Sequence, residues 1–387
     1  MDIRGLVLVN AGVSNGAGEF PWSAAPLALV EVAGRSPLGR IAERLRRYGV
    51  SQSTVVLESP VLPQAANNGA EGTRYSLTGR QRFWRAAESA FNDMAQEGAE
   101  LVLVLRLGAY AEVDFERLVQ FHLERACRVS QLVNEAGTLE VFCISASRRN
   151  DAASLFRSGL TRCRSECPVL EHQGYVNPLA SAADLRQFAI DILTLETETS
   201  PAGEQWRPGV WVAPGAKIER GARLLAPAFI GRAARLRSGA VITRCSAIEH
   251  HAEVDCGTVV ENSSVLPYSY LGAGLDLAHS VVGMGAIANL RRNAVVEMAD
   301  PRLVGHIAAT TGRNFLRSAA AYCGFLLKQV WQGFPSADRE PQPDIETALQ
   351  RTSPALGDAA GFQAPACNTK AADEYASMAV ARRYGNE

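Results

Sequence analysis

An uninterrupted six-residue period constrains this chain of 387 residues more than any other feature. An α-helix does not repeat at six residues, whereas a parallel β-helix does. Each hexapeptide forms one side of a three-sided coil and points one aliphatic side chain into the shared interior. The period therefore predicts a parallel β-helix over residues 210–300. The branched aliphatic residues that carry it are Val212, Ile218, Leu224, Ile230, Leu236, Ile242, Ile248, Val254 and Val260.

The period shifts by one residue after Val260. A second six-residue series passes through Val259, Val265, Leu271 and Leu277. This shift indicates either a bulged corner or a coil shortened by one residue. Glycine and proline, which suit the sharp corners of such a coil, recur between the aliphatic positions. The regular coils are expected to end near residue 282.

The first half of the chain alternates predicted strands and helices. Apolar runs at residues 5–10 and 100–105 are typical of buried strands, and residues 37–48 place their apolar side chains on one helical face. Such alternation predicts an α/β domain with a mostly parallel sheet over residues 1–196, followed by a polar linker at residues 197–209. Further strands are expected at 53–57, 129–133 and 139–144, and further helices at 80–95, 114–127 and 185–195.

The end of the chain and its composition limit the function classes. Residues 301–334 are expected to form a helical segment that caps the coils or contacts a second subunit, and residues 335–387 a mostly disordered tail. A net charge of −1 gives no electrostatic support for nucleic-acid binding. The chain has no apolar stretch suited to a transmembrane segment, and its eight scattered cysteines are expected to be reduced. We therefore expect a cytoplasmic protein.

An α/β domain followed by coils resembles the sugar-nucleotide pyrophosphorylases. Residues 5–34 are similar to that family's first strand, phosphate loop and proline-rich segment, and residues 100–122 and 174–195 to the segments with its two metal ligands. The resemblance implies a nucleotidyltransferase-like, Rossmann-like domain and a left-handed β-helix. It also implies a nucleotide or nucleotide sugar as ligand. The family's reaction condenses a sugar 1-phosphate with a nucleoside triphosphate, and Mg²⁺ would be needed if that activity is retained.

The residues that carry this transfer in the family have no counterparts here. Residues 5–34 contain no Arg or Lys, so only backbone N–H groups remain to hold a phosphate in the first loop. The two metal-ligand positions fall on Gly108 and Asn177, and neither brings a negative charge to a hard cation. We therefore expect no catalytic or metal-binding residue for the transfer. The candidate phosphate-loop residues are Asn10, Ala11, Gly12, Gly16 and Gly18.

These observations favour a pyrophosphorylase-like protein of sugar-nucleotide or polysaccharide biosynthesis with impaired catalysis. It would act as a binding or regulatory subunit, either as a homo-oligomer or beside an active relative. One alternative is an active transferase with relocated metal ligands, for example Glu112 or Asp114. Another is a hexapeptide acyltransferase with His250 or His251 as general base. Both histidines are expected to project outward beside a corner of the coil.

Overall fold

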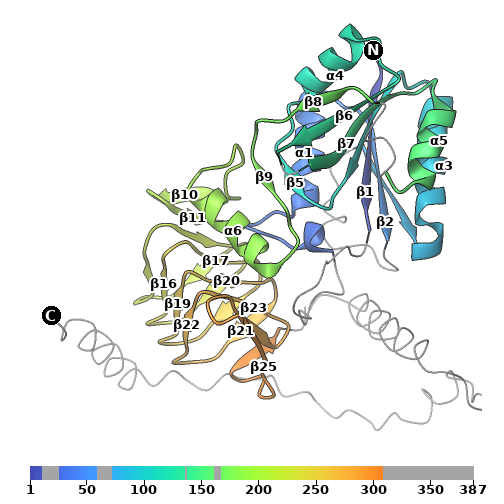
Figure 1. Cartoon of the computed structure of the whole chain (residues 1–387). Coiled ribbons are helices and arrows are strands. Elements are labelled where there is room, and N and C mark those ends of the chain that lie inside the picture. Colours follow the sequence, from blue (N-terminus) through green and yellow to red (C-terminus); the bar gives the residue numbers. More distant parts are fainter. Residues whose placement is uncertain (11–25, 59–71, 136, 161–166, 308–387) are drawn as a thin grey trace, which may run out of the picture.

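A computed structural model describes residues 1–10, 26–58, 72–135, 137–160 and 167–307. It consists of an α/β part and a coil of short strands, with helix α6 (Ala182–Leu193) at the junction (Figure 1). The expected helical segment at residues 301–334 is wrong for its first residues, because residues 301–303 form a turn and Val304–His306 a strand. Residues 308–334 and the expected tail lie outside the described residues. No helix within the described ranges is long and apolar enough to cross a membrane.

The α/β part is built on a seven-stranded sheet in the order β3-β2-β1-β4-β7-β6-β8. All its strands run parallel except β7, which is antiparallel to both β4 and β6, so the expected mostly parallel sheet is confirmed. The strands are β1 Ile3–Val9, β2 Ser53–Glu58, β3 Thr73–Thr78, β4 Leu101–Arg106, β6 Val129–Asn134, β7 Gly137–Ser145 and β8 Val169–Glu171.

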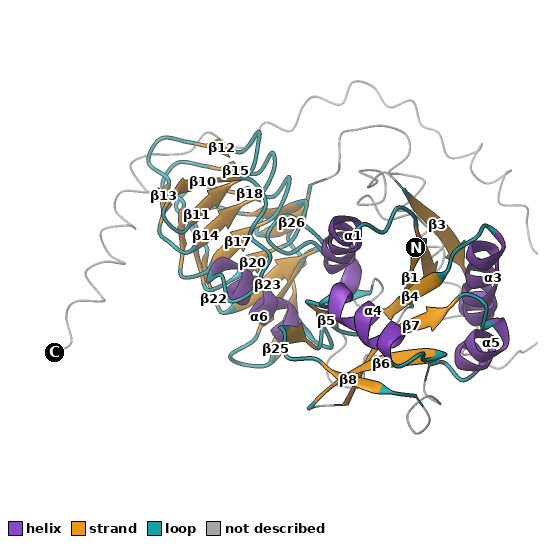
Figure 2. Cartoon of the chain, turned by 90° about the horizontal axis from the view of Figure 1, so that it is seen from above, coloured by secondary structure: helices purple, strands orange, loops and turns teal. Residues whose placement is uncertain are grey.

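Helices cover both faces of this sheet. Helices α1 (Pro37–Tyr48) and α4 (Phe115–Glu124) lie on one face, and α3 (Phe83–Gln96) and α5 (Arg149–Arg157) on the other (Figure 2). Helix α1 has the bounds that the sequence predicts. The Ser36 side chain caps its first turn, and Gly49 ends it in the left-handed conformation, at a φ of 99°. The short helices η1 (Leu27–Leu29) and η2 (Arg80–Arg82) complete the described helices.

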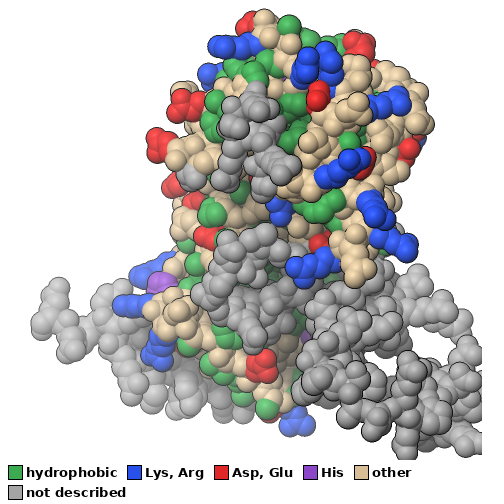
Figure 3. Space-filling view, turned by 45° about the vertical axis from the view of Figure 1, so that its right-hand side comes forward, with side chains coloured by type: hydrophobic (Ala, Val, Ile, Leu, Met, Phe, Trp, Pro, Cys, Tyr) green, Lys and Arg blue, Asp and Glu red, His purple; other side chains and the backbone are tan. Residues whose placement is uncertain are grey.

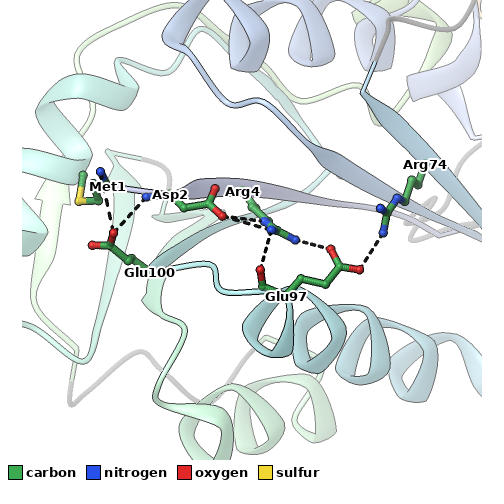
Figure 4. Close-up of polar contacts among 6 residues, drawn as sticks. All are labelled: Met1, Asp2, Arg4, Arg74, Glu97 and Glu100. Carbon is green, nitrogen blue, oxygen red and sulfur yellow. Dashed lines mark hydrogen bonds and ion pairs between the residues drawn. The ribbon is translucent and has the colours of Figure 1, made fainter.

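A polar network holds the amino-terminal end of the sheet to α3 (Figure 4). Arg4 of β1 is only 7% exposed, and its guanidinium donates to the carboxylates of Asp2 and Glu97. Glu97, just after α3, also accepts from Arg74 of β3 at 3.0 Å. One carboxylate therefore links the centre of the sheet to its edge strand.

The coil has three sides, each a stack of short parallel strands, so it is β-helix-like. We call the side that faces the α/β part the seam sheet. It contains β11 Val210–Val212, β14 Ala228–Ile230, β17 Ser246–Ile248, β20 Ser264–Val265 and β23 Ser280–Gly283. The second side contains β12 Lys217–Ile218, β15 Arg235–Leu236, β18 Glu253–Val254 and β21 Ser269–Leu271. The third contains β13 Arg223–Leu224, β16 Val241–Thr243, β19 Val259–Glu261 and β22 Asp276–Ala278.

The shift in the six-residue period is a shortening of the coil. Val241 pairs with Val259, eighteen residues on, whereas Ala247 pairs with Ser264, seventeen residues on. Val260 and Val265 are both fully buried, while the side chain of Val259 is only partly buried. The corner between β19 and β20 therefore contains one residue fewer, and the aliphatic side chains on both sides of it still point inward.

Antiparallel strands close both ends of the coil. The parallel stack ends with β23, as expected near residue 282, and β24 (Ala286–Asn289) and β25 (Ala294–Glu297) continue its sheet in antiparallel fashion. Strand β26 (Val304–His306) pairs antiparallel with β21 on the second side. At the other end β10 (Glu204–Arg207), within the stretch expected as a linker, pairs antiparallel with β11.

The two parts share one apolar core. Phe188 of α6 belongs to the same buried cluster as the outward-facing Phe229, Ala247 and Val281 of the seam sheet. Arg186, on the same helix, is 3% exposed and donates four hydrogen bonds to groups of the coil. Burial lowers the pKa of its guanidinium to about 10. The junction is therefore a packed interface.

The cysteines agree only in part with the expectation of reduced thiols. Cys127, Cys143 and Cys245 are free. Cys167 and Cys256 are disulfide-bonded, so the expectation is wrong for these two. Burial raises the pKa of the Cys143 thiol to about 12, which keeps it protonated and unreactive.

Candidate functional site

The carboxyl ends of β1 and β4 bring an amide and a guanidinium together. Strand β1 leads into Asn10, and β4 ends at Arg106, which lies beside Leu8 in the parallel ladder. Arg106 Nε donates to Asn10 Oδ1 at 3.0 Å. Ligands of parallel α/β sheets bind outside the carboxyl ends of the strands, so Asn10 stands where the sequence places it. The other loop candidates, Ala11, Gly12, Gly16 and Gly18, lie outside the described residues.

Arg106 is a further candidate, which the sequence pattern did not single out. It supplies from β4 the positive charge that the loop after β1 lacks. Its guanidinium also donates to Glu140 Oε1 at 2.7 Å and lies 5.6 Å from the centre of the Trp84 ring. The sequence signal that could have identified it is a basic residue at the end of a buried strand. Because the Glu140 carboxylate neutralises this charge, Arg106 attracts an anion less strongly than an unpaired arginine would.

The structure brings into one region the two positions, Gly108 and Asn177, that the resemblance assigned to metal ligands. Strands β5 (Tyr110–Ala111) and β9 (Val176–Asn177) pair antiparallel. Tyr110, two residues after Gly108, lies opposite Asn177. Gly108 has no side chain to offer. Asn177 is 3% exposed, its Oδ1 accepts from Leu179 N at 3.0 Å, and its Nδ2 donates to Asp184 O at 3.0 Å. Both polar atoms of Asn177 thus stabilise the turn before α6.

The alternative metal ligands are also engaged in structural hydrogen bonds. Glu112 is only 3% exposed, and its carboxylate accepts from Glu198 N at 2.7 Å and from Thr199 Oγ1 at 3.2 Å. Asp114 caps α4 by accepting from Arg117 N. Within the described ranges, no group of three or more His, Cys, Asp or Glu side chains is placed to hold a metal ion. These residues therefore do not fit a Mg²⁺ site.

His250 and Glu249 form a second polar cluster, at the junction of the two parts. His250 projects outward from the coil as expected, but it is only 8% exposed and Glu249 only 1%. Both are buried because this corner, after β17, packs against residues 31–34 of the α/β part. Glu249 accepts from Ala33 N at 2.7 Å and from Gly34 N at 2.9 Å. His251 is partly buried.

Burial makes Glu249 an unusual carboxyl group. Loss of water raises its pKa to about 7, and the nearby Glu31 carboxylate acts in the same direction. The two backbone N–H groups and His250 oppose that shift without cancelling it. A carboxyl group with this pKa changes its charge near neutral pH. It therefore titrates at the contact between the coil and the α/β part.

A histidine–carboxylate pair lies beside Glu249. His250 Nδ1 is 2.6 Å from Glu31 Oε2. The His250 ring meets the Tyr268 ring edge to face, at 5.0 Å between centres, and His251 stacks on Tyr268 at the same distance. Burial, with help from His250, lowers the pKa of His251. The His250–Glu31 arrangement orients an imidazole as a general base requires, and it also ties the coil to the α/β part.

The surface charge favours no particular partner on the face that Figure 3 shows. Cationic and anionic side chains are interspersed there over the upper, α/β part of the molecule. A nucleic-acid surface would gather cations in one stripe.

Comparison with known proteins adds no relative. No protein-family model matches the chain, and no curated protein matches its sequence.

Proposed function

We propose that this chain is a sugar-nucleotide pyrophosphorylase-like protein that has lost the transfer chemistry. It serves as a binding or regulatory subunit in sugar-nucleotide or polysaccharide biosynthesis. In this proposal the α/β part is nucleotidyltransferase-like and the coil is a left-handed β-helix. A nucleotide or nucleotide sugar binds at the carboxyl ends of β1 and β4.

One observation carries the proposal. Of the two positions that the resemblance assigns to metal ligands, Asn177 lies in the β5–β9 ladder and Gly108 just before it, yet neither supplies a charged metal ligand. Gly108 has no side chain, and the side-chain oxygen and nitrogen of Asn177 are already hydrogen-bonded to Leu179 N and Asp184 O. Transfer between two phosphates requires cations to screen the repulsion between them. A site with Arg106 and without acidic metal ligands is better suited to holding a nucleotide than to activating it.

Calorimetric titration tests the proposal. We expect the purified protein to bind a nucleotide or nucleotide sugar without Mg²⁺, and Arg106→Ala to weaken that binding about tenfold, the loss of one charge-assisted contact. Arg117→Ala, on the exposed side of α4, is the matched control and should bind as the wild type does. Formation of a nucleotide sugar from a sugar 1-phosphate and a nucleoside triphosphate, by the pure protein with Mg²⁺, would refute the proposal.

The second candidate function is acyl transfer, and the His250–Glu31 contact favours it. With Nδ1 held by the carboxylate, His250 Nε2 would take the proton of an acceptor hydroxyl or amine as it attacks an acyl thioester. The departing thiolate would then receive that proton. Glu31→Gln keeps the size of the side chain and removes its charge, so it should lower an acyl-transfer rate while leaving the fold intact. Equal rates for Glu31→Gln, His250→Ala and wild type would exclude this role.

A further inference from the structure

A pocket of about 360 Å³ lies at the corner between β22 and β23, beside the turn between β24 and β25. Its size is that of a small-ligand site. It is lined by Asp276, Ala278, His279, Asn289, Arg291 and Arg292.

Hydrogen bonds fix the turn that carries the two arginines. Leu290 N donates to His279 O at 2.8 Å, which ties the turn to the corner between β22 and β23. Asn289 Oδ1 accepts from Arg292 N at 3.0 Å, and Asn289 Nδ2 donates to Ala278 O at 3.3 Å. The backbone of both arginines is thus held over the corner. Within the part of the chain that the structure describes, neither guanidinium forms an ion pair with a carboxylate.

A chain of hydrogen bonds sets the proton position on His279. The buried Arg186 donates to Asn262 Oδ1 at 2.8 Å, so the oxygen of that amide faces α6 and its nitrogen faces away. Asn262 Nδ2 lies 2.6 Å from His279 Nδ1. An amide nitrogen only donates, so Nδ1 accepts, and the proton of the neutral ring is on Nε2. His279, which lines the pocket, therefore carries an N–H donor on Nε2.

We propose that this pocket binds a small phosphomonoester that also carries hydroxyl groups, such as a hexose phosphate. Arg291, Arg292 and His279 Nε2 supply donors to the three phosphate oxygens, and Asp276 accepts from a hydroxyl group. A phosphate dianion suits two guanidiniums better than a carboxylate ligand does, because it has three oxygens and each guanidinium can bind two oxygens at once. The site is separate from the nucleotide site proposed at Arg106, and it does not depend on that proposal.

Titration of the full-length protein with glucose 6-phosphate, inorganic phosphate and glucose tests the site. We expect glucose 6-phosphate to bind most tightly and glucose not at all. Arg291→Ala with Arg292→Ala should weaken binding of glucose 6-phosphate at least tenfold, as loss of charge-assisted contacts does. The control is Arg220→Ala with Arg223→Ala, which removes the same charge from the first coil and should leave binding unchanged. Equal affinities for the two double variants would refute the site, as would no binding of glucose 6-phosphate by wild type.

The histidine has its own tests. His279 has a φ of 51°, in the left-handed region that asparagine also tolerates, so His279→Asn removes the Nε2 donor without straining the corner. We expect several-fold weaker binding, and a nitrogen-15 NMR spectrum of the wild type that shows the Nε2-protonated form. A ring protonated on Nδ1 alone would contradict the hydrogen-bond chain. Equal affinity for inorganic phosphate and glucose 6-phosphate would refute the role of Asp276 and with it the hydroxylated class of ligand.

Discussion

Glu249→Gln should remove a pH dependence from the stability of the protein. Glu249 binds its proton more tightly in the folded chain, with a pKa of about 7 against an ordinary value of 4.5. Between these two values the folded state holds more protons than the unfolded state, so this group makes the free energy of unfolding fall as pH rises. From pH ~5 to pH ~8 the loss amounts to roughly 2 to 3 kcal/mol.

Urea unfolding followed by tryptophan fluorescence at several pH values measures this loss. The wild type should lose stability relative to Glu249→Gln as pH rises through 7, and the difference should become constant near pH ~8. Glu253→Gln, on the next strand, also loses a carboxylate and controls for the change in net charge. Parallel stability curves for wild type and Glu249→Gln would mean that Glu249 is ionised throughout, and that Ala33 N and Gly34 N offset its burial.

Three further changes test other contacts. Asn177→Asp should lower the free energy of unfolding by about 1–3 kcal/mol, because a carboxylate cannot donate to Asp184 O; urea unfolding measures this, and an unchanged midpoint would contradict it. Arg186→Ala should cost about 2–4 kcal/mol in the same assay, since it leaves carbonyls of Cys245 and Asn262 without their buried donor. Hydrogen bonds from Arg74 and Arg4 lower the pKa of the Glu97 carboxyl group in the folded protein. The stability that these bonds contribute is therefore complete above the ordinary carboxyl pKa, and it is lost as pH falls through the lower pKa of the folded state. Glu97→Gln should therefore reduce the urea midpoint at neutral pH, and less so in high salt; a salt-independent effect would count against this ion pair.

Local sequence patterns predicted most helices and strands, whereas they could not predict contacts between residues far apart in the sequence. Helix α1 has its expected bounds because a serine, a proline and a glycine mark its ends. Strand β3 was missed because it is a polar edge strand, with alternating Thr, Arg, Tyr and Ser. The direction of β7 depends on its two neighbours in the sheet, which no pattern within β7 records.

The candidate site shows the same division. Asn10 is a candidate because it follows a buried strand, whereas Arg106 ends a different strand and no pattern in the loop after β1 points to it. The contact of Glu249 with Ala33 joins residues 216 positions apart, and no pattern near Glu249 in the sequence predicts it. The period predicted that Glu249 and His250 lie outside the coil. It could not say that another part of the chain covers them there.

The six-residue period nevertheless contains a signal for the covered side. The residue just before each inward aliphatic residue points outward, and on two sides these residues include Lys217, Arg223, Arg235 and Glu253, which suit water. On the seam sheet they are Trp211, Phe229, Ala247 and Val281, with Ser264 the only polar member. An apolar residue at every third hexapeptide would be costly on a free surface. The seam sheet is the side where they occur, and all four apolar members pack in the core shared with α6. A hexapeptide repeat should therefore be analysed in both series, because the inward residues predict the coil and the outward ones predict which of its sides is covered.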